Sequence, residues 1–325
     1  MSLIVKPRGN PPRVRNSHII PRFYLNKFAD STKHTFVYEK GRQPRKKSTK
    51  TQCSEIDYFE YEVGNEVSNN RHEQIFAGIE NLAGKAYSKI LRGEPLDQDQ
   101  ITGWALFVAT VFLRSRKVRN QMAPRIMAEL KDSYLAPEQI RNMQHELFKQ
   151  GQLVTVGELT ATIQKTWNQI NANPAYLQLV GVDQSACNLG VELGKKHWHT
   201  LEAAPERVFV TSDCPVFTWK LIGGGAAFPG YGFGQEDVAI IIPLSPRKVF
   251  VASPPTISWS KVLDAHSTDL FNESLVQFAD KSVFSIEKSE KTRILVDEEI
   301  NKIIFGVNAF SSPKERTQSL IDSKN

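Results

Sequence analysis

The character of the sequence changes near residue 195, and this change restricts the fold more than any other feature. Before it, apolar residues recur at the three- and four-residue spacing of helices, as in residues 75–90. After it, short runs rich in β-branched and aromatic residues, such as 206–212 and 237–244, are divided by turn residues. Residues 293–297 read as a last strand of this kind. We therefore predict an α+β protein, with a helical segment in the first half and a mostly antiparallel sheet in the second half.

The length of 325 residues allows one large hydrophobic core or two smaller ones. The sequence contains no internal repeat and no clear linker, which favours a single domain over residues 1–325. Within this domain we distinguish a basic arm with short strands at 1–66, a helical segment at 67–180 and a β-rich segment at 181–320.

The apolar segments and the cysteines indicate a cytoplasmic protein without a membrane span. Residues 103–113 are apolar on every side of a helix, so this helix must be buried, but eleven residues are too few to cross a bilayer. Residues 1–15 contain no apolar run of the length that a signal peptide needs. The three cysteines form no Cys-x-x-Cys pair, so they encode neither a disulfide framework nor a cysteine zinc site.

Positive charge is concentrated at the start of the chain. Residues 1–50 hold 13 lysines and arginines against two acidic residues, a net charge of +11, whereas residues 51–325 carry a net charge of −5. Such asymmetry favours a polyanionic partner such as nucleic acid, because cations that neutralise phosphates release counterions. A solvated arm, or an arm that docks on the acidic remainder of the protein, explains the same charges. The candidate phosphate contacts are Arg13, Arg15, Arg22, Arg45, Lys46 and Lys47.

A motif of histidine, proline and aromatic residues follows the arm. It reads His18-x-x-Pro21-x-x-Tyr24-Leu25-x-x-Phe28, and it resembles the N-terminal signature of the bacterial domain-of-unknown-function family 4238. Later residues continue this resemblance in the expected order over nearly the whole chain. They are Glu80, Arg114, Trp198, Thr211, Ser212, Asp213, Pro215, the stretch Pro243–Pro246, and Asn272. The resemblance implies one family domain, and it implies no particular reaction or ligand.

Two residues of the resemblance are of types that carry chemistry, His18 and Asp213. Histidine titrates near neutral pH and can act as a base, an acid or a metal ligand, although His18 could equally cap the segment that follows it. Asp213 comes after a buried strand, where it could bind a metal, orient His18 or act as a base. Before a proline, Asp213 could instead satisfy the backbone amides of a turn. Ser212 lacks the Gly-x-Ser-x-Gly elbow of hydrolases.

His197 and His199 lie two residues apart, so on a strand their side chains point to the same face of the sheet. With Asp213 on a neighbouring strand they could form a metal site of two histidines and one carboxylate, and a divalent metal is the one cofactor that the sequence suggests. The spacing is also frequent by chance, and an exposed sheet face would accept both rings.

Charged residues in the helical segment supply further candidates. Arg114 begins a cluster of cations after the apolar helix, which either clamps a phosphate or carboxylate group or complements the dipole of that helix. The other cations of this cluster are Arg116, Lys117 and Arg119. Glu73 and Glu80 are two helical turns apart and can share a face, and Glu55 is a further candidate acid. An ion pair between Glu80 and Arg114 would suit two adjacent helices packed for stability, and it would suit an active site.

Two classes of function fit these residues. The chain has no Gly-x-x-x-x-Gly-Lys loop, dinucleotide fingerprint or His-Glu-x-x-His motif, which disfavours ATPases, nicotinamide enzymes and zinc proteases. The first class is an enzyme acting on nucleic acid or nucleotides, such as a nuclease-like effector. Its candidate catalytic residues are His18, Glu80, Arg114 and Asp213. The second class is a non-catalytic nucleic-acid-binding or protein-interaction module, in which these residues hold the arm against the sheet.

Overall fold

The computed structural model describes residues 16–63, 66–67, 71–122, 128, 131, 135–179, 182–222, 226–229 and 232–302. Within them the predicted α+β class is confirmed, because helices lie mostly in the first half of the chain and antiparallel sheets later. The helices are α1 (Arg22–Leu25), α2 (Arg71–Arg92), α3 (Gln98–Leu113), α5 (Pro137–Lys149), α6 (Val156–Asn171), α7 (Pro174–Leu179), α8 (Val182–Gly194), α9 (Ala265–Phe278) and α10 (Glu290–Glu299). The strands are β1 (Asn16–His18), β2 (His34–Tyr38), β3 (Arg45–Ser48), β4 (Ser54–Ile56), β5 (Glu62–Val63), β6 (Glu66–Val67), β7 (His197–Glu202), β8 (Thr211–Ser212), β9 (Phe217–Ile222), β10 (Ala226–Pro229), β11 (Val238–Ser245), β12 (Lys248–Ser253) and β13 (Val283–Ser285).

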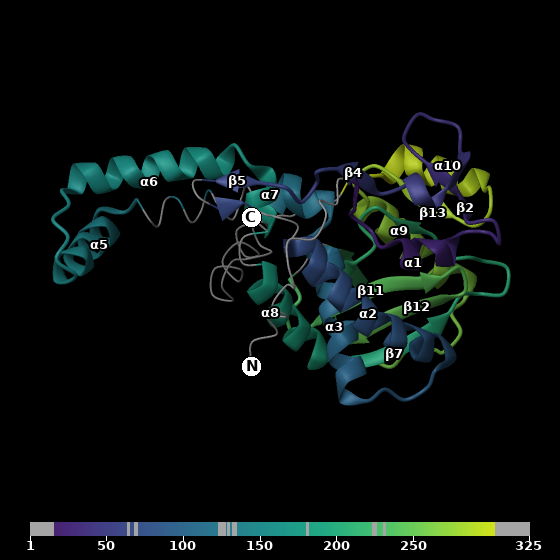
Figure 1. The fold of residues 1–325 in the computed structure, drawn as a ribbon. Coiled ribbons are helices and arrows are strands. Elements are labelled where there is room, and N and C mark those ends of the chain that lie inside the picture. Colours follow the sequence, from purple (N-terminus) through teal and green to yellow (C-terminus); the bar gives the residue numbers. More distant parts are fainter. Residues whose placement is uncertain are drawn as a thin grey trace, which may run out of the picture.

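The main sheet has the strand order β10-β9-β11-β12-β7, and all neighbouring strands in it are antiparallel. On one face, Phe250 of β12 packs against Trp104 of α3, with ring centroids 5.5 Å apart. On the opposite face, Trp219 of β9 packs against Phe271 of α9 at 4.4 Å. Figure 1 shows α2 and α3 crossing the first of these faces. β11 is buried along almost its whole length because helices cover both faces, which explains its unbroken apolar sequence.

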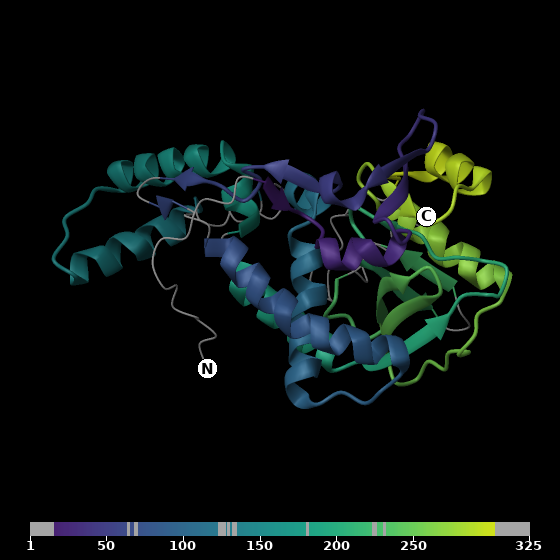
Figure 2. The same cartoon turned by 45° about the vertical axis from the view of Figure 1, so that its right-hand side comes forward.

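A second antiparallel sheet joins distant parts of the chain. Its order, β3-β2-β13-β8, pairs strands from residues 34–48 with strands from residues 211–285. The short helix α1 lies between this sheet and α2, which it contacts through Phe23 and Tyr87 at a ring distance of 5.9 Å (Figure 2). The start of the chain is therefore built into the body of the protein from residue 16 onward.

A β-bulge in β11 fixes α1 and α2 to the main sheet. The register between β11 and β12 shifts between Pro243 and Ser245, which frees carbonyl groups of β11 for side-chain donors. The hydroxyl of Tyr24 in α1 donates to the carbonyl of Pro243 at 2.8 Å. The hydroxyl of Tyr87 in α2 donates to the carbonyl of Leu244. Two stretches of the family resemblance, the N-terminal motif and residues 243–246, therefore meet in space.

Removing the Tyr24 hydroxyl tests this anchor. The hydroxyl also accepts a hydrogen bond from the Thr211 hydroxyl at 2.8 Å, since its own proton goes to Pro243. Tyr24→Phe leaves both buried partners unsatisfied, so we expect it to lower the free energy of unfolding by about 1–3 kcal/mol. Urea unfolding with an unchanged m-value measures this loss. A loss below about 0.5 kcal/mol, the usual scatter for an unimportant site, would contradict the anchor.

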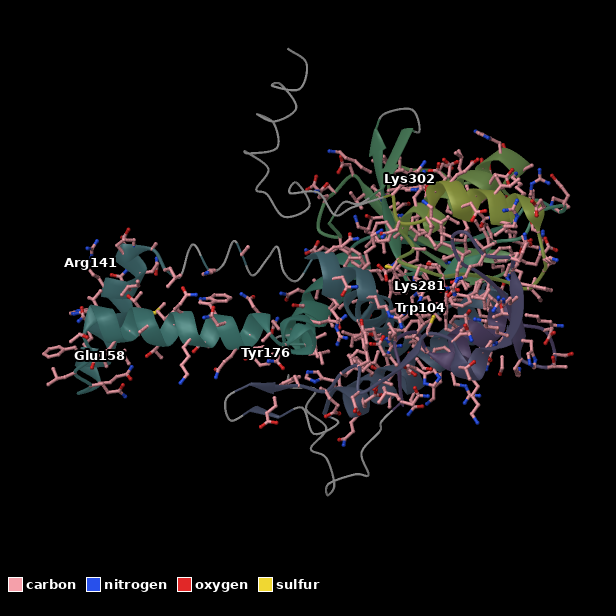
Figure 3. The ribbon with its side chains drawn as sticks, turned by 90° about the horizontal axis from the view of Figure 1, so that it is seen from above. Trp104, Arg141, Glu158, Tyr176, Lys281 and Lys302 are labelled. Atoms are coloured by element: carbon pink, nitrogen blue, oxygen red, sulfur yellow. The ribbon has the colours of Figure 1, made fainter. Side chains whose placement is uncertain are left out.

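Helices α5 and α6 form a hairpin that extends away from both sheets (Figure 1). α5 begins with Pro137, and α6 begins with a capping box between Thr155 and Glu158. Figure 3 shows Arg141 and Glu158 at the far end of the hairpin and Trp104 in the body. Across the described ranges, no helix combines the length and the apolar character that a membrane crossing requires.

The prediction of a strand at residues 293–297 is wrong, because these residues belong to helix α10. Ser289 caps the first turn by accepting a backbone amide of that turn at 3.2 Å. Arg293 pairs with Glu290 and with Asp297, which lie one turn before it and one turn after it. The local cap and the spacing of the charges favour a helix over the strand that the apolar residues alone suggested.

Candidate functional site

Four polar side chains from three segments meet beside α1. We call them the polar cluster: His18 at the end of β1, Glu73 and Glu80 on α2, and Arg114 at the C-terminal end of α3. β1 is held by pairing with β4, and the next residue, Ile19, is buried. Glu73 and Glu80 share a face of α2, as their seven-residue spacing predicts.

Arg114 is the most deeply buried member of the cluster, with only 2 % of its side chain exposed. Its Nη1 donates to Oε1 of Glu80 at 2.9 Å, so the predicted ion pair between the adjacent helices is present. The guanidinium carbon lies 5.2 Å from the centre of the Phe76 ring, which stacks under the charge. Its Nε and Nη2 atoms are also buried, and none of the described residues accepts a hydrogen bond from them. Glu80 therefore satisfies one edge of the guanidinium and leaves the other edge free.

His18 is half-buried and held in one orientation by the backbone of Lys50, whose carbonyl accepts a hydrogen bond from the ring. Its Nε2 is buried and meets no hydrogen-bonding group within the described ranges, so the nitrogen that donates to Lys50 is Nδ1. Burial lowers the pKa of His18 below its ordinary value of 6.5, and the positive charges of Arg22 and Arg114 lower it further. The Lys50 carbonyl and Glu80 oppose this shift. His18 is therefore a neutral imidazole near pH 7, with an unshared electron pair on Nε2.

Glu73 is the second acid of the cluster. Burial raises its pKa, and the negative charges of Glu80 and Glu60 add to this shift, while a hydrogen bond from the Ser17 hydroxyl and the charge of Arg114 oppose it. Its Oε1 is buried and accepts no hydrogen bond from the residues that the structure describes. Glu73 thus holds a proton more readily than an exposed glutamate, whereas His18 in the same cluster loses its proton more readily than an exposed histidine.

Asp213 is bound by a loop outside the polar cluster. Its carboxylate accepts the backbone amides of Asp280, Lys281 and Ser282 at 2.9–3.0 Å, so both oxygens are engaged. Burial raises its pKa to about 6, and the charge of Asp280 adds to this shift. These contacts match the alternative prediction of an aspartate that satisfies backbone amides, although the amides belong to a distant loop. The charged groups that act on His18 do not include Asp213.

The other cations that follow α3 each contact a different element. Arg116 pairs with Glu55 at 2.9 Å, and Nε of Arg119 donates to the side chain of Gln178 at 3.0 Å. Lys117 is completely buried, and its Nζ donates to the carbonyls of residues 277 and 278, at 3.3 and 3.0 Å, where α9 ends. Lys117 therefore complements the dipole of α9, a helix other than the one it follows.

Two further residues of the family resemblance have contacts that stabilise the fold. The Asn272 side chain accepts the amide of Val210 at 3.0 Å and donates to the carbonyl of Val208 at 2.8 Å. The indole of Trp198 donates to the carbonyl of Leu193 at 2.9 Å. Both side chains are hydrogen-bonded to the backbone, so we assign them a structural role.

The basic residues predicted from the sequence lie partly beside the cluster. Arg22 is exposed at the start of α1 and acts electrostatically on His18. Arg45, Lys46 and Lys47 lie on the edge strand β3, where Lys46 pairs with Asp30 at 2.7 Å. Arg13 and Arg15 fall outside the described residues. Since Lys50 contacts His18 directly, residues 22–50, which we call the basic segment, end at the polar cluster.

The proposed histidine metal site lacks a third ligand. His197 and His199 do share a face of β7, but the described part of the chain contains no group of three histidine, cysteine, aspartate or glutamate side chains that could hold a metal ion. In the polar cluster, Glu80 is already engaged by Arg114. The polar cluster thus brings together an imidazole, a carboxyl group and a guanidinium, which are groups that can transfer protons and bind anions.

Sequence reasoning missed the parts of this site that come from the backbone and from packing. The Lys50 carbonyl and the Phe76 ring carry no signal of their own, since any residue has a carbonyl and Phe76 belongs to an apolar helix stripe. Ser17 was detectable, because it stands next to His18 in the motif.

A comparison with protein families identifies one match. The family model described as "Protein of unknown function (DUF4238)" matches residues 16–289, which confirms the family that the sequence predicted. Neither the curated proteins nor the solved structures contain a match to this chain. The matched range includes every member of the polar cluster.

Proposed function

Since the chain belongs to the family described as "Protein of unknown function (DUF4238)", which names no activity, we propose a function from the polar cluster itself. The protein is a cytoplasmic enzyme that acts on the phosphate groups of nucleic acids or nucleotides. One observation carries this proposal: His18, Glu73 and Arg114 belong to one electrostatic cluster, and each has a buried atom with no hydrogen-bond partner in the described part of the chain. Each unsatisfied atom costs about 1–3 kcal/mol, and a bound phosphate group would offset that cost.

The four side chains divide the work as follows. Nε2 of His18 accepts a proton from the attacking water or hydroxyl, because the ring is neutral and Nδ1 is held by Lys50. Arg114 binds phosphate oxygens, and Glu80 fixes the position of its guanidinium. Glu73 supplies a proton to the leaving oxygen, since burial favours its protonated form.

The basic segment supports a polyanionic substrate. It contributes Arg22 beside His18 and the cations of β3 at the edge of the second sheet. Cations on an exposed edge strand also prevent edge-to-edge aggregation, so their presence alone would not identify a ligand. Their continuity with the polar cluster through Lys50 links them to the proposed reaction.

The alternative is a non-catalytic binding module, in which Glu80 and Arg114 only join α2 to α3. The ion pair itself favours this alternative, because it is a complete structural contact. A second ion pair from the same segment, Glu55 with Arg116, has the same 2.9 Å distance and provides a matched control.

The test is cleavage of DNA, RNA and nucleotides by the full chain, with and without Mg²⁺ or Mn²⁺, at two salt concentrations. Glu80→Gln removes a charged partner of Arg114, an interaction worth about 1.5–3 kcal/mol, so we expect it to lower the rate about 10- to 100-fold. Glu55→Gln breaks the corresponding pair outside the cluster and should leave the rate within about twofold.

The outcomes separate the two classes of function. A loss of cleavage in Glu80→Gln alone supports the enzyme. Equal losses in both variants indicate that the ion pairs act through folding. Salt-sensitive binding without cleavage supports the binding module, because phosphate contacts weaken as salt rises. If the protein neither binds nor cleaves these molecules, nucleic acids and nucleotides are excluded as its substrates.

A further inference from the structure

The free edge of Arg114 has a shape that selects its ligand. Nη1 donates to Glu80, whereas Nε and Nη2 lie on the other edge of the guanidinium, where no described residue accepts a hydrogen bond from them. These two nitrogens form a fork that can donate two parallel hydrogen bonds to two oxygens of one anion. The N–H groups of a guanidinium lie in its plane, so an anion binds in that plane, along this edge.

The depth of the fork restricts what can reach it. Only 2 % of the Arg114 side chain is exposed, whereas its partner Glu80 is 28 % exposed and His18 is half-buried. An incoming group must therefore leave the solvent almost completely to meet the fork. An internal phosphodiester is flanked by two nucleotides, and both would have to enter the polar cluster with it. A phosphate at the end of a chain has one attachment and can enter alone.

The charges also favour a terminal phosphate. A phosphomonoester carries a charge of about −1.5 to −2 near pH 7 and three terminal oxygens. Two of these oxygens match the fork of Arg114. Arg22 adds a second positive charge near His18, which offsets the negative charge of Glu80.

We propose that the polar cluster binds a terminal phosphate group, carried by a nucleotide or by the end of a nucleic-acid chain, through the Nε–Nη2 fork of Arg114. This inference rests on the proposed function and specifies its substrate. The enzyme then acts at chain ends or on free nucleotides, and closed circular nucleic acid is not a substrate.

The experiment compares substrates that differ only in their ends. Linear single-stranded DNA and RNA carrying a 5′-phosphate, a 3′-phosphate or neither are tested beside circular single strands of the same sequence and beside nucleoside monophosphates. We expect processing of one phosphorylated end to exceed that of the hydroxyl end at least tenfold, and circles to remain intact. Monophosphates identify a free nucleotide as the substrate if they are processed and the oligonucleotides are not.

A binding measurement makes the result independent of catalysis. Titration of the full chain with a nucleoside monophosphate should give an affinity that falls at least tenfold in Arg114→Lys, because lysine keeps the charge but lacks the fork. Glu55→Gln serves as the folded control. Circles cut as fast as linear strands would overturn the terminal-phosphate inference and leave the proposed function standing. If no substrate is cut, the proposed function fails. Equal binding of phosphorylated and unphosphorylated ends by the wild type would overturn the inference even if Arg114→Lys does not fold.

Discussion

Substitution of His18 by glutamine is expected to lower the rate of the proposed reaction by about 100- to 10,000-fold, the usual contribution of a general base. Glutamine is polar and of similar size, but it cannot accept a proton at neutral pH. The loss should appear in kcat more than in KM, because Nε2 of His18 acts on the proton in transfer and Arg114 holds the substrate. Steady-state kinetics of the two proteins on the preferred substrate measure the split.

The pH profile adds a readout that a purely structural histidine would not change. Burial, Arg22 and Arg114 lower the pKa of His18, with the Lys50 carbonyl and Glu80 acting in the opposite direction. Because the neutral form is the active one, kcat/KM of the wild type should decrease with falling pH, with a midpoint below pH 6.5. This decrease should be absent in His18→Gln.

His199 offers a matched control. It is also half-buried, burial also lowers its pKa, and its Nε2 likewise meets no hydrogen-bonding group in the described residues. It lies on β7, outside the polar cluster. His199→Gln should keep activity within about threefold, a change of less than 1 kcal/mol in the barrier. Similar losses in both variants, or retention of activity in His18→Gln, would remove His18 from the proposed mechanism.

Asp213→Ala is expected to destabilise the protein by about 3–5 kcal/mol, the cost of deleting one side of a buried charged contact. The substitution leaves the buried amides of residues 280–282 without their acceptor. A loss of this size is a large part of the stability of a typical domain. Chemical unfolding measures this loss of stability. A variant with normal stability and no activity would instead indicate that Asp213 belongs to the active site.

Asp213→Asn separates the charge of this residue from its shape. The pKa of Asp213 rises from 3.8 to about 6 in the folded state, so the folded protein binds the proton more tightly than the unfolded chain does. Its contribution to stability is therefore fully present below pH 4 and is lost as the pH rises through about 6. The asparagine variant lacks this dependence. Its destabilisation relative to the wild type should be smaller at pH 8 than at pH 5, by about 1 kcal/mol.

The sequence predicts the contacts that depend on side-chain type and helical spacing. Glu80 and Arg114 lie on adjacent helices with opposite charges, and the structure pairs them. His18 and Arg114, both members of the resemblance, belong to one cluster. The α+β class follows from the change in pattern near residue 195, because helical and strand periodicities are set locally.

What the sequence does not predict depends on the backbone of distant segments. The tautomer of His18 is set by the carbonyl of Lys50, and the partners of Asp213 are amides almost 70 residues later. Neither contact requires a particular side chain at the partner position, so no residue type signals it. The sequence also does not predict that Nε and Nη2 of Arg114 lack an acceptor among the described residues, because this depends on which atoms are buried.

The cations after α3 place a strict limit on how this part of the chain can vary. Arg114, Arg116, Lys117 and Arg119 each reach a separate partner, in α2, in β4, at the end of α9 and in α7. Arg114 is the residue at which α3 ends, and each residue added to a helix rotates the chain that follows by about 100°. Inserting or deleting one residue ahead of Arg114 would turn all four side chains away from their partners together. We therefore expect residues 114–119 to tolerate substitutions between their contact residues better than insertions or deletions.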